Sequence, residues 1–276
     1  MNILITGANG YLAKFFIKEL FSNTKHDLTL LVRKDSNVDD LLKYVDIKNI
    51  IFYDGNIKSL NVLQNNKTDL IFHLANYYPD ANRPAIPEEI ISSNLTLIAN
   101  VISSIRDGNN CRIINIDSYV TIGRQYSLYG LTKQAAERYI SAHNGESYIL
   151  YDTYGANDPR PKLINHLINY SKTGKKLKMK HSKDSQINLV YIKDVISAFM
   201  LAIDKKQHLT CKISTETLTL KKVIDTFNEV SEKKVNVMWP EDNCNYLPVI
   251  PEEVKKPKGW EQRYNLIMGL TEMLKS

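Results

Sequence analysis

The chain has 276 residues, of which 43% are hydrophobic and 24% are charged. This composition can supply the core of one large domain, with or without a smaller appendage. No long unbroken apolar run occurs, so we expect no membrane-spanning helix, and the opening residues lack the regions of a secretory leader. The three cysteines, at positions 111, 211 and 244, fit neither a disulfide framework nor a zinc site, which favours a cytoplasmic location.

The net charge is +6, and the positive residues are unevenly distributed. Six lysines fall between positions 172 and 183, and three more stand at 255, 256 and 258. A solvated surface is the simplest interpretation, and a site for the diphosphate of an anionic ligand is the alternative. No basic module with interleaved aromatic residues accompanies them, so we expect no nucleic-acid partner. The six histidines show no metal-ligand spacing, so we expect no metal.

The first half of the chain alternates short β-rich runs with longer amphipathic segments. Strands are predicted at 2–6, 28–32, 50–53, 70–74, 112–116 and 148–151, and helices at 11–22, 87–105 and 129–142. Strands that alternate with helices in this way require a parallel sheet with helices on both faces. The sequence therefore predicts an α/β fold with a doubly wound parallel sheet of the Rossmann type.

The alternation ends after residue 155, where a proline-rich turn precedes a helix predicted over 162–173. The run 189–192 and the helix after it are predicted to return to the main sheet. We therefore expect a dinucleotide-binding Rossmann domain and a smaller, discontinuous C-terminal domain for the substrate. Their predicted residues are 1–155 with 186–213, and 156–185 with 214–276. A homodimer is compatible with this organisation.

A glycine pattern opens the first predicted helix, in the run Thr6-Gly7-Ala8-Asn9-Gly10-Tyr11-Leu12-Ala13. Gly7 permits a tight turn, Gly10 lets the backbone approach a pyrophosphate, and Ala13 lets helix and strand pack closely. The start of the helix offers unpaired N–H groups to phosphates. We expect cofactor contacts from Gly7, Asn9, Gly10, Tyr11 and Leu12, and a glycine turn without a ligand is the alternative.

The end of the second predicted strand indicates which dinucleotide is bound. A carboxylate there would accept a hydrogen bond from the ribose 2′-hydroxyl of NAD, but the chain carries Arg33 and Lys34. Two cations suit the additional 2′-phosphate of NADP. Asp35 follows them and weakens this argument. The prediction is NADP(H), with NAD as the alternative.

A tyrosine and a lysine four residues apart provide the candidate catalytic group. Tyr129 and Lys133 would lie on one face of a helix. The ammonium could lower the pKa of the phenol and bind the nicotinamide ribose, which leaves a phenol able to exchange a proton with a carbonyl. Ser118 lies just past a predicted strand, where it could bind the same carbonyl oxygen.

Together these motifs resemble the extended short-chain dehydrogenase/reductases, which include nucleotide-sugar epimerases, dehydratases and reductases. The resemblance extends to His73-Leu74-Ala75, Asn94, Tyr154-Gly155, the run 190–195 and Gly259-Trp260. It implies further cofactor contacts at Asn56, Leu74, Ala75 and Asn94, and a nucleotide-sugar substrate. It also implies substrate contacts at Tyr77, Tyr78, Arg83, Ser118, Tyr119 and Arg160.

Within this family the chain is most similar to 4-keto reductases such as the CDP-abequose and CDP-paratose synthases. The similarity lies in Asn115-Ile116-Asp117-Ser118, in the short step to Tyr129, and in Thr132-Lys133. Two departures matter. Tyr119-Val120 follow Ser118 where dehydratases carry Asp-Glu, which disfavours 4,6-dehydration. Ile187 stands where many relatives have an arginine that grips the diphosphate, so Arg160 or a lysine of the basic run must serve.

The sequence therefore predicts an oxidoreductase that uses NADPH to reduce the 4-keto group of a nucleotide-linked 6-deoxy or dideoxy sugar. Such sugars belong to surface-polysaccharide synthesis, including the lipopolysaccharide O-antigen. A nucleotide-sugar 4-epimerase with retained NAD is the first alternative. A non-catalytic relative that binds a dinucleotide or RNA is the second, and the presence of Ser118, Tyr129 and Lys133 argues against it.

Overall fold

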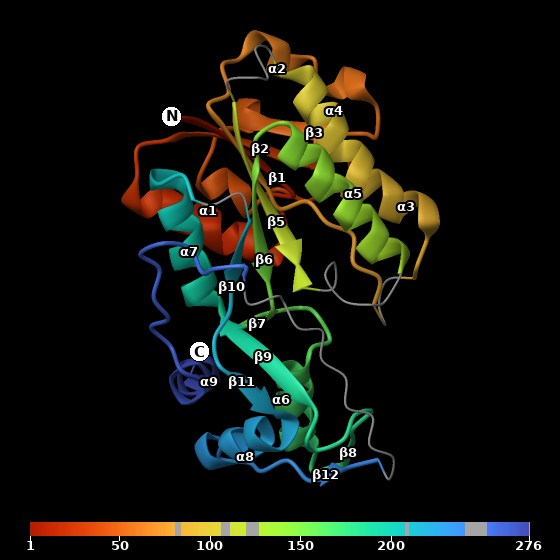
Figure 1. The fold of residues 1–276 in the computed structure, drawn as a ribbon, viewed down its shortest axis with the longest axis vertical. Helices are drawn as coiled ribbons and strands as arrows, with labels where there is room; N and C mark the ends of the chain where they lie inside the picture. The colour runs from red at the N-terminus through yellow and green to blue at the C-terminus, as the bar shows by residue number, and fades with distance from the viewer. Residues whose placement is uncertain (81–83, 106–110, 120–126, 208–209, 241–252, 276) are drawn as a thin grey trace.

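A seven-stranded parallel sheet forms the centre of the protein in a computed structural model (Figure 1). The structure describes residues 1–80, 84–105, 111–119, 127–207, 210–240 and 253–275. The strand order is β10-β6-β5-β4-β1-β2-β3. The strands are β1 (Asn2–Thr6), β2 (Asp27–Arg33), β3 (Ile50–Tyr53), β4 (Leu70–His73), β5 (Arg112–Ser118), β6 (Glu146–Leu150) and β10 (Thr210–Ile213).

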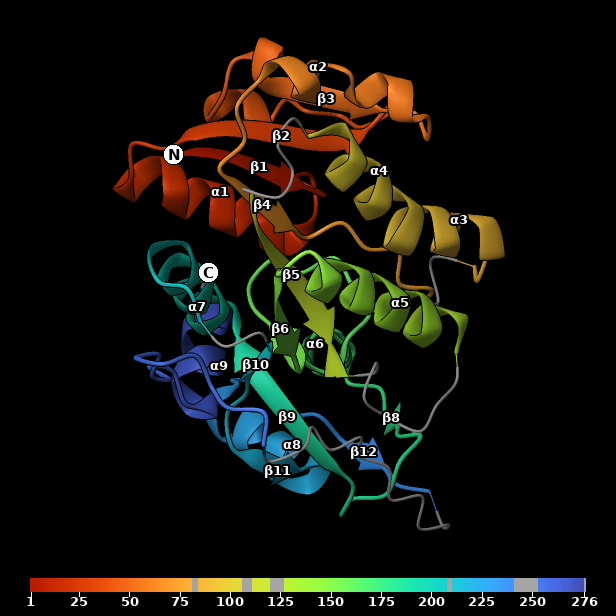
Figure 2. The same cartoon turned by 45° about the horizontal axis from the view of Figure 1, so that its top comes forward.

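Helices cover both faces of this sheet, which confirms the predicted doubly wound fold (Figure 2). One face packs against α1 (Tyr11–Asn23) and α7 (Ile192–Asp204), and the other packs against α4 (Leu97–Ser104) and α5 (Leu128–Ala142). The predicted helix 87–105 is three pieces, α3 (Pro87–Ile91), a π-helical turn at Ser92–Thr96 and then α4. Short helical turns follow β2 and β3 at Leu41–Lys43, Ile47–Asn49, Ile57–Leu60 and α2 (Val62–Asn65).

Helix α1 packs against the sheet through apolar residues whose helical spacing is visible in the sequence. Ala13, Phe16, Ile17 and Leu20 are buried on one side of it. The Phe16 ring lies 4.3 Å from that of Phe72 on β4 and 5.5 Å from that of Phe199 on α7, measured between ring centroids. Burying a phenylalanine contributes about 1.5–3 kcal/mol. This aromatic cluster therefore holds the middle of α1, the helix that follows the glycine loop, against the sheet.

The second half of the chain builds two small sheets beside the main one (Figure 1). The three-stranded sheet has the order β11-β9-β7, and a separate pair joins β12 to β8. Strand β9 belongs to this small sheet, so the prediction that 189–192 returns to the main sheet is wrong. Helix α7 and strand β10 make that return. The elements are β7 (Asp152–Tyr154), α6 (Leu163–Thr173), β8 (Leu177–Lys178), β9 (Gln186–Tyr191), β11 (Thr217–Thr219), α8 (Leu220–Val230), β12 (Val237–Met238) and α9 (Leu266–Lys275).

A buried aspartate on α7 holds the C-terminal segment in place. The Asp194 carboxylate accepts hydrogen bonds from the backbone N–H groups of Arg263 and Tyr264, at 2.9 and 3.1 Å. The indole N–H of Trp260 donates to the Asp194 carbonyl at 3.1 Å. The run 190–195 and Gly259-Trp260, far apart in sequence, are therefore partners in space. Within the described ranges no helix is long and apolar enough to cross a membrane.

Candidate functional site

The glycine loop makes a tight turn between β1 and α1. Gly7 has a φ of +66°, and the N–H of Gly10 donates to its carbonyl at 2.9 Å. A β-carbon on Gly7 would lie 2.6 Å from the Ala75 Cα, so the loop touches the backbone that follows β4. Gly10 caps α1 without a side-chain hydrogen bond. The loop therefore presents the start of a helix dipole that no side chain neutralises, which suits an anion.

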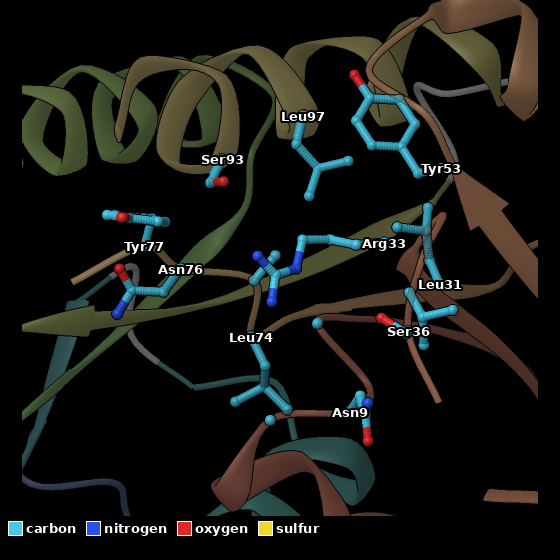
Figure 3. A pocket seen from close by; sticks show the side chains of 14 residues that line it. Asn9, Leu31, Arg33, Ser36, Tyr53, Leu74, Asn76, Tyr77, Ser93 and Leu97 are labelled. Carbon is cyan, nitrogen blue, oxygen red and sulfur yellow. The ribbon is translucent and has the colours of Figure 1, made fainter. Parts of the chain in front are cut away.

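A cleft with a volume of about 180 Å³ runs from this loop across the carboxyl ends of the strands (Figure 3). It lies where the strand order reverses between β4 and β1, the usual ligand position in such sheets. Figure 3 shows Arg33 extending from the end of β2 into the space between Leu97 and Leu74. The lining residues are Gly7, Asn9, Gly10, Leu31, Val32, Arg33, Ser36, Tyr53, Leu74, Ala75, Asn76, Tyr77, Ser93 and Leu97.

The structure brings together six of the predicted cofactor residues, namely Gly7, Asn9, Gly10, Arg33, Leu74 and Ala75. Lys34 is exposed and is not among the lining residues. Asn56 caps the turn Ile57–Leu60 by accepting a hydrogen bond from the Lys58 N–H. The Tyr11 hydroxyl donates to the Ala156 carbonyl at 3.1 Å, and Leu12 packs against the apolar core. Sequence reasoning missed Ser36, Tyr53 and Ser93, which are polar lining residues on other elements.

Asn94 holds the loop after β4 rather than facing the cleft. Its amide oxygen accepts from the Tyr77 N–H at 2.7 Å, and its amide nitrogen donates to the Tyr77 carbonyl at 3.2 Å and to the Thr132 hydroxyl at 3.3 Å. These bonds tie the loop to α5. The π-helical turn that contains Asn94 also carries Ser93 into the lining. A direct contact between Asn94 and a cofactor stays a prediction.

Tyr129 and Lys133 are both buried near the start of α5. The helix is capped by Ser127, whose hydroxyl accepts from the Gly130 N–H at 3.0 Å. The Asn76 amide donates to the Tyr129 hydroxyl at 3.3 Å, and the Tyr78 ring meets the Tyr129 ring edge-on at 4.9 Å. The tyrosine therefore lies at the inner end of the cleft, beside a lining residue that sequence reasoning missed.

The environment of Tyr129 keeps its phenol protonated. Burial raises the pKa of the phenol well above its usual value, and the nearby charge of Asp117 raises it further. Side-chain hydrogen bonds with Asn76 and Ser118 lower the pKa in part. Ser118, at the end of β5, therefore lies beside the phenol, and its predicted contact with a substrate carbonyl stays a prediction. The arrangement can donate a proton to an oxygen placed between the two hydroxyls.

Lys133 is directed at the end of β5. Its ammonium donates to the Ile116 carbonyl at 2.8 Å and lies 3.7 Å from a carboxylate oxygen of Asp117. Burial lowers the pKa of Lys133, and Asp117 opposes that effect. Sequence reasoning did not assign a role to Asp117, although an acidic residue directly before Ser118 was a signal. The predicted effect of Lys133 on the phenol stays a prediction.

The predicted substrate residues are spread over several segments around the cleft and Tyr129. Tyr77 lines the cleft, and its hydroxyl donates to the Pro84 carbonyl at 3.0 Å. Tyr78 is half exposed against Tyr129. The Tyr119 hydroxyl donates to the Asp152 carboxylate at 3.1 Å. Arg83 lies outside the described residues.

Most contacts of the Arg160 side chain are with residues close to it in the sequence. Its guanidinium forms an ion pair with Asp158, donates to the Thr153 hydroxyl at 3.0 Å, and lies 5.0 Å above the Tyr11 ring. Close by, the Lys162 ammonium lies 3.3 Å from Asp152, the same carboxylate that Tyr119 contacts. Asp152 and Lys162 were not singled out in the sequence, because nothing local marks them as neighbours of Ser118 and Tyr119.

Among the described residues, no group of three histidine, cysteine or acidic side chains is close enough to hold a metal ion. The arrangement is instead that of an α/β protein with a dinucleotide-type cleft and a tyrosine–lysine–serine set at its inner end. The chain belongs to the NAD dependent epimerase/dehydratase family, whose pattern matches residues 3–212.

The relatives found by comparison agree with that membership. The chain is 26% identical to CDP-abequose synthase from Yersinia pseudotuberculosis, over 86% of this chain and 87% of that protein. It is 22% identical to dTDP-4-dehydro-6-deoxyglucose reductase from Escherichia coli, over 99% and 96%. The fold is similar to that of UDP-glucose 4-epimerase from Thermus thermophilus, crystallised with NAD, with a TM-score of 0.80, 16% identity and coverage of 100% and 98%.

The close approach of Gly7 to Ala75 gives a testable prediction. Gly7 and Gly174 share a φ of +66°, but nothing lies within 4 Å of a β-carbon built on Gly174. Gly174→Ala should lower the free energy of unfolding by about 1–2 kcal/mol, the cost of a left-handed alanine. Gly7→Ala should lower it by about 3 kcal/mol or more, because overpacking adds to that cost. Urea denaturation measures both, and equal losses would show that the contact with Ala75 is unimportant.

Proposed function

We propose that this protein uses NADPH to reduce the 4-keto group of a nucleotide-linked 6-deoxy or dideoxy sugar, as a step in making a surface polysaccharide. The observation that carries the proposal is the buried pair of Tyr129 and Lys133 beside Ser118, at the inner end of a cleft whose outer end holds Arg33. The similarity to CDP-abequose synthase and to dTDP-4-dehydro-6-deoxyglucose reductase supports it.

The residues of the cleft fit a phosphorylated dinucleotide. The uncapped start of α1 and the turn from Gly7 to Gly10 would hold the diphosphate, because no side chain competes for the helix N–H groups. Arg33 and Ser36 would hold a 2′-phosphate, and no carboxylate is among the described residues that line this end. When bound, NADPH supplies the hydride. NAD remains the alternative cofactor.

Three side chains would take part in the proton transfer to the carbonyl oxygen. Tyr129 gives its phenol proton to the carbonyl oxygen as that oxygen gains charge, and Ser118 holds the oxygen in place by hydrogen bonding. The ammonium of Lys133 stabilises the phenolate that is left and binds the ribose. Tyr129 then recovers a proton from solvent. Burial keeps the Tyr129 phenol in the protonated form that a proton donor needs, and it lowers the pKa of Lys133.

The nucleotide-sugar would lie beyond Tyr129, against Tyr78 and Tyr119. Its diphosphate requires cations, and we propose Lys162 beside Arg160. The charge of Arg160 and burial both lower the pKa of Lys162, and a bound diphosphate would relieve that repulsion. Arg160 would exchange part of its contact with Asp158 for the ligand. Asp152, which contacts both Tyr119 and Lys162, would orient them.

The phenol can be tested directly. Tyr129→Phe should keep cofactor affinity and lower kcat by about two to four orders of magnitude, the usual contribution of a general acid. Lys133→Met should weaken cofactor binding as well as turnover, because Lys133 serves both ribose and phenol. Steady-state kinetics and cofactor titration measure these effects. Turnover of Tyr129→Phe within a few-fold of the parent would remove the tyrosine from this role.

Cofactor choice rests on Arg33. Arg33→Ala should weaken NADPH binding by about 1.5–3 kcal/mol, as expected for a charge-assisted contact, and leave NADH binding nearly unchanged. Lys34→Ala is the matched control, since Lys34 is adjacent and exposed but does not line the cleft. Fluorescence titration with both dinucleotides gives the six affinities of the parent protein and the two variants. Equal losses for NADPH and NADH, or tighter NADH binding by the parent protein, would contradict the assignment.

Reductase and epimerase differ in what happens to the cofactor. An epimerase returns the hydride to its own substrate and gains by retaining the dinucleotide, whereas a reductase must release it after each turnover. We expect the purified protein to carry little bound cofactor. With a nucleotide-linked 4-keto-6-deoxy sugar it should consume one NADPH per product, followed by loss of absorbance of the reduced nicotinamide. Interconversion of two C4-hydroxyl sugars without net NADPH loss would favour the epimerase.

A further inference from the structure

Four polar side chains form a row across the main sheet beneath α5. Thr6, His73, Asn115 and Ser147 are paired strand to strand, Thr6 with His73, His73 with Asn115, and Asn115 with Ser147. Each is at most 2% exposed. Leu4, Ile71 and Ile113, two residues earlier on three of these strands, belong to the apolar cluster that α5 completes. The row is therefore a polar line within an apolar face, at the level of the catalytic group.

Hydrogen bonds join the first two side chains of the row and the last two, but not the middle pair, His73 and Asn115. The Thr6 hydroxyl is 2.7 Å from His73 Nδ1, and the Asn115 amide nitrogen donates to the Ser147 hydroxyl at 3.2 Å. In the part of the chain that the structure describes, His73 Nε2 and Asn115 Oδ1 are buried without a protein partner. Leaving two such atoms unpaired is costly, and they belong to neighbouring side chains on one face.

The bonds of Thr6 indicate which nitrogen of His73 carries the proton. The Ala75 N–H donates to the Thr6 oxygen at 3.2 Å, so the Thr6 hydroxyl proton is available for His73 Nδ1. Nδ1 then accepts, and Nε2 carries the hydrogen. A donor at Nε2 thus faces a neighbour whose unpaired atom, Asn115 Oδ1, is an acceptor. The two atoms are complementary but do not meet within hydrogen-bond distance.

We propose that His73 and Asn115 hold one buried water molecule, which also accepts a hydrogen bond from the ammonium of Lys133. The water would accept from His73 Nε2 and donate to Asn115 Oδ1, which gives it the three bonds typical of a buried water. Lys133 is close by, since its ammonium donates to the carbonyl of Ile116, the residue after Asn115. Burial, and to a lesser extent the charge of Lys133, lowers the pKa of His73 to about 3. His73 is therefore neutral at working pH and suited to donate from a single nitrogen.

The site gives His73 and Asn115 a positioning role. The Lys133 ammonium has three donors, of which one goes to the Ile116 carbonyl at 2.8 Å, and the Asp117 carboxylate lies 3.7 Å away. A water bound by His73 and Asn115 would accept from another donor and so orient the side chain. Charged and titratable groups around Lys133 are Asp117 on β5, His73 on β4 and Tyr129 on α5. This positioning role rests on the proposed function, whereas the water site does not.

The water and the tautomer can be observed in the unmodified protein. A crystal structure that resolves ordered water should show one peak within hydrogen-bond distance of His73 Nε2, Asn115 Oδ1 and Lys133 Nζ. Nitrogen-15 NMR should show His73 with its proton on Nε2 and without protonation through the weakly acidic range. A direct hydrogen bond between His73 and Asn115, or a proton on Nδ1, would overturn the proposal. Neither measurement depends on turnover, so a failed reductase assay would count against the proposed function alone.

Two substitutions of one residue test the positioning role. The amide of His73→Gln can reach the place of Nε2, whereas that of His73→Asn can reach only the place of Nδ1. We expect His73→Gln to keep the KM for NADPH within about threefold, and His73→Asn to raise it about tenfold or more, because the ammonium is misplaced. Loss of an acceptor also lowers the pKa of Lys133, so the alkaline limb of activity should move to lower pH in His73→Asn only. The reverse order would mean that the bond to Thr6 matters and the water does not.

Discussion

The contact between Gly7 and the backbone at Ala75 is the constraint on which the rest of the cleft depends. It brings the first turn of the chain against the end of β4, where the strand order reverses, and only a residue without a β-carbon permits it. The Thr6 hydroxyl then reaches the Ala75 N–H, and the loop after β4 is directed past the glycine loop toward Tyr129. One close approach thus aligns the glycine-loop end of the cleft with the end beside Tyr129.

The group around Tyr129 combines burial with compensating partners. Burial shifts the pKa of Tyr129 and that of Lys133 toward the neutral form of each residue, and Asp117 is buried beside them on β5. Asp117 opposes the fall in the pKa of Lys133, and hydrogen bonds with Asn76 and Ser118 limit the rise in the pKa of Tyr129. Burying three ionisable side chains together is expensive for stability, which marks the group as a candidate functional site.

Three features could be predicted because each depends on local spacing in the sequence. Alternating strands and helices predict the sheet, and a glycine turn predicts the loop. A helix with two side chains on one face predicts the pair Tyr129 and Lys133, with Ser118 before them in the chain. The partners of these residues could not be predicted. Asn76 and Asp117 become functional candidates only when β4 and β5 pair and α5 covers them. Likewise, sequence treats Arg33 and Lys34 alike, although only Arg33 turns into the cleft where β2 ends. The run 189–192 was predicted to lie in the main sheet for the same reason, because an apolar run does not show which strand it pairs with.

The path of β6 into β7 connects the main sheet to the small sheet near Ser118 and Tyr119. β6 pairs with β5 in the main sheet, and after Tyr151 the same run of chain becomes β7, which pairs with β9 in the small sheet. Tyr119, just past β5, bonds to Asp152 at the start of β7 and stacks on Tyr151, with ring centroids 5.2 Å apart. A shift of the small sheet would therefore move the residues that follow Ser118. Asp194 likewise ties the C-terminal segment to α7, so segments that lie far apart in the sequence are joined to the main sheet and its covering helices through side-chain bonds.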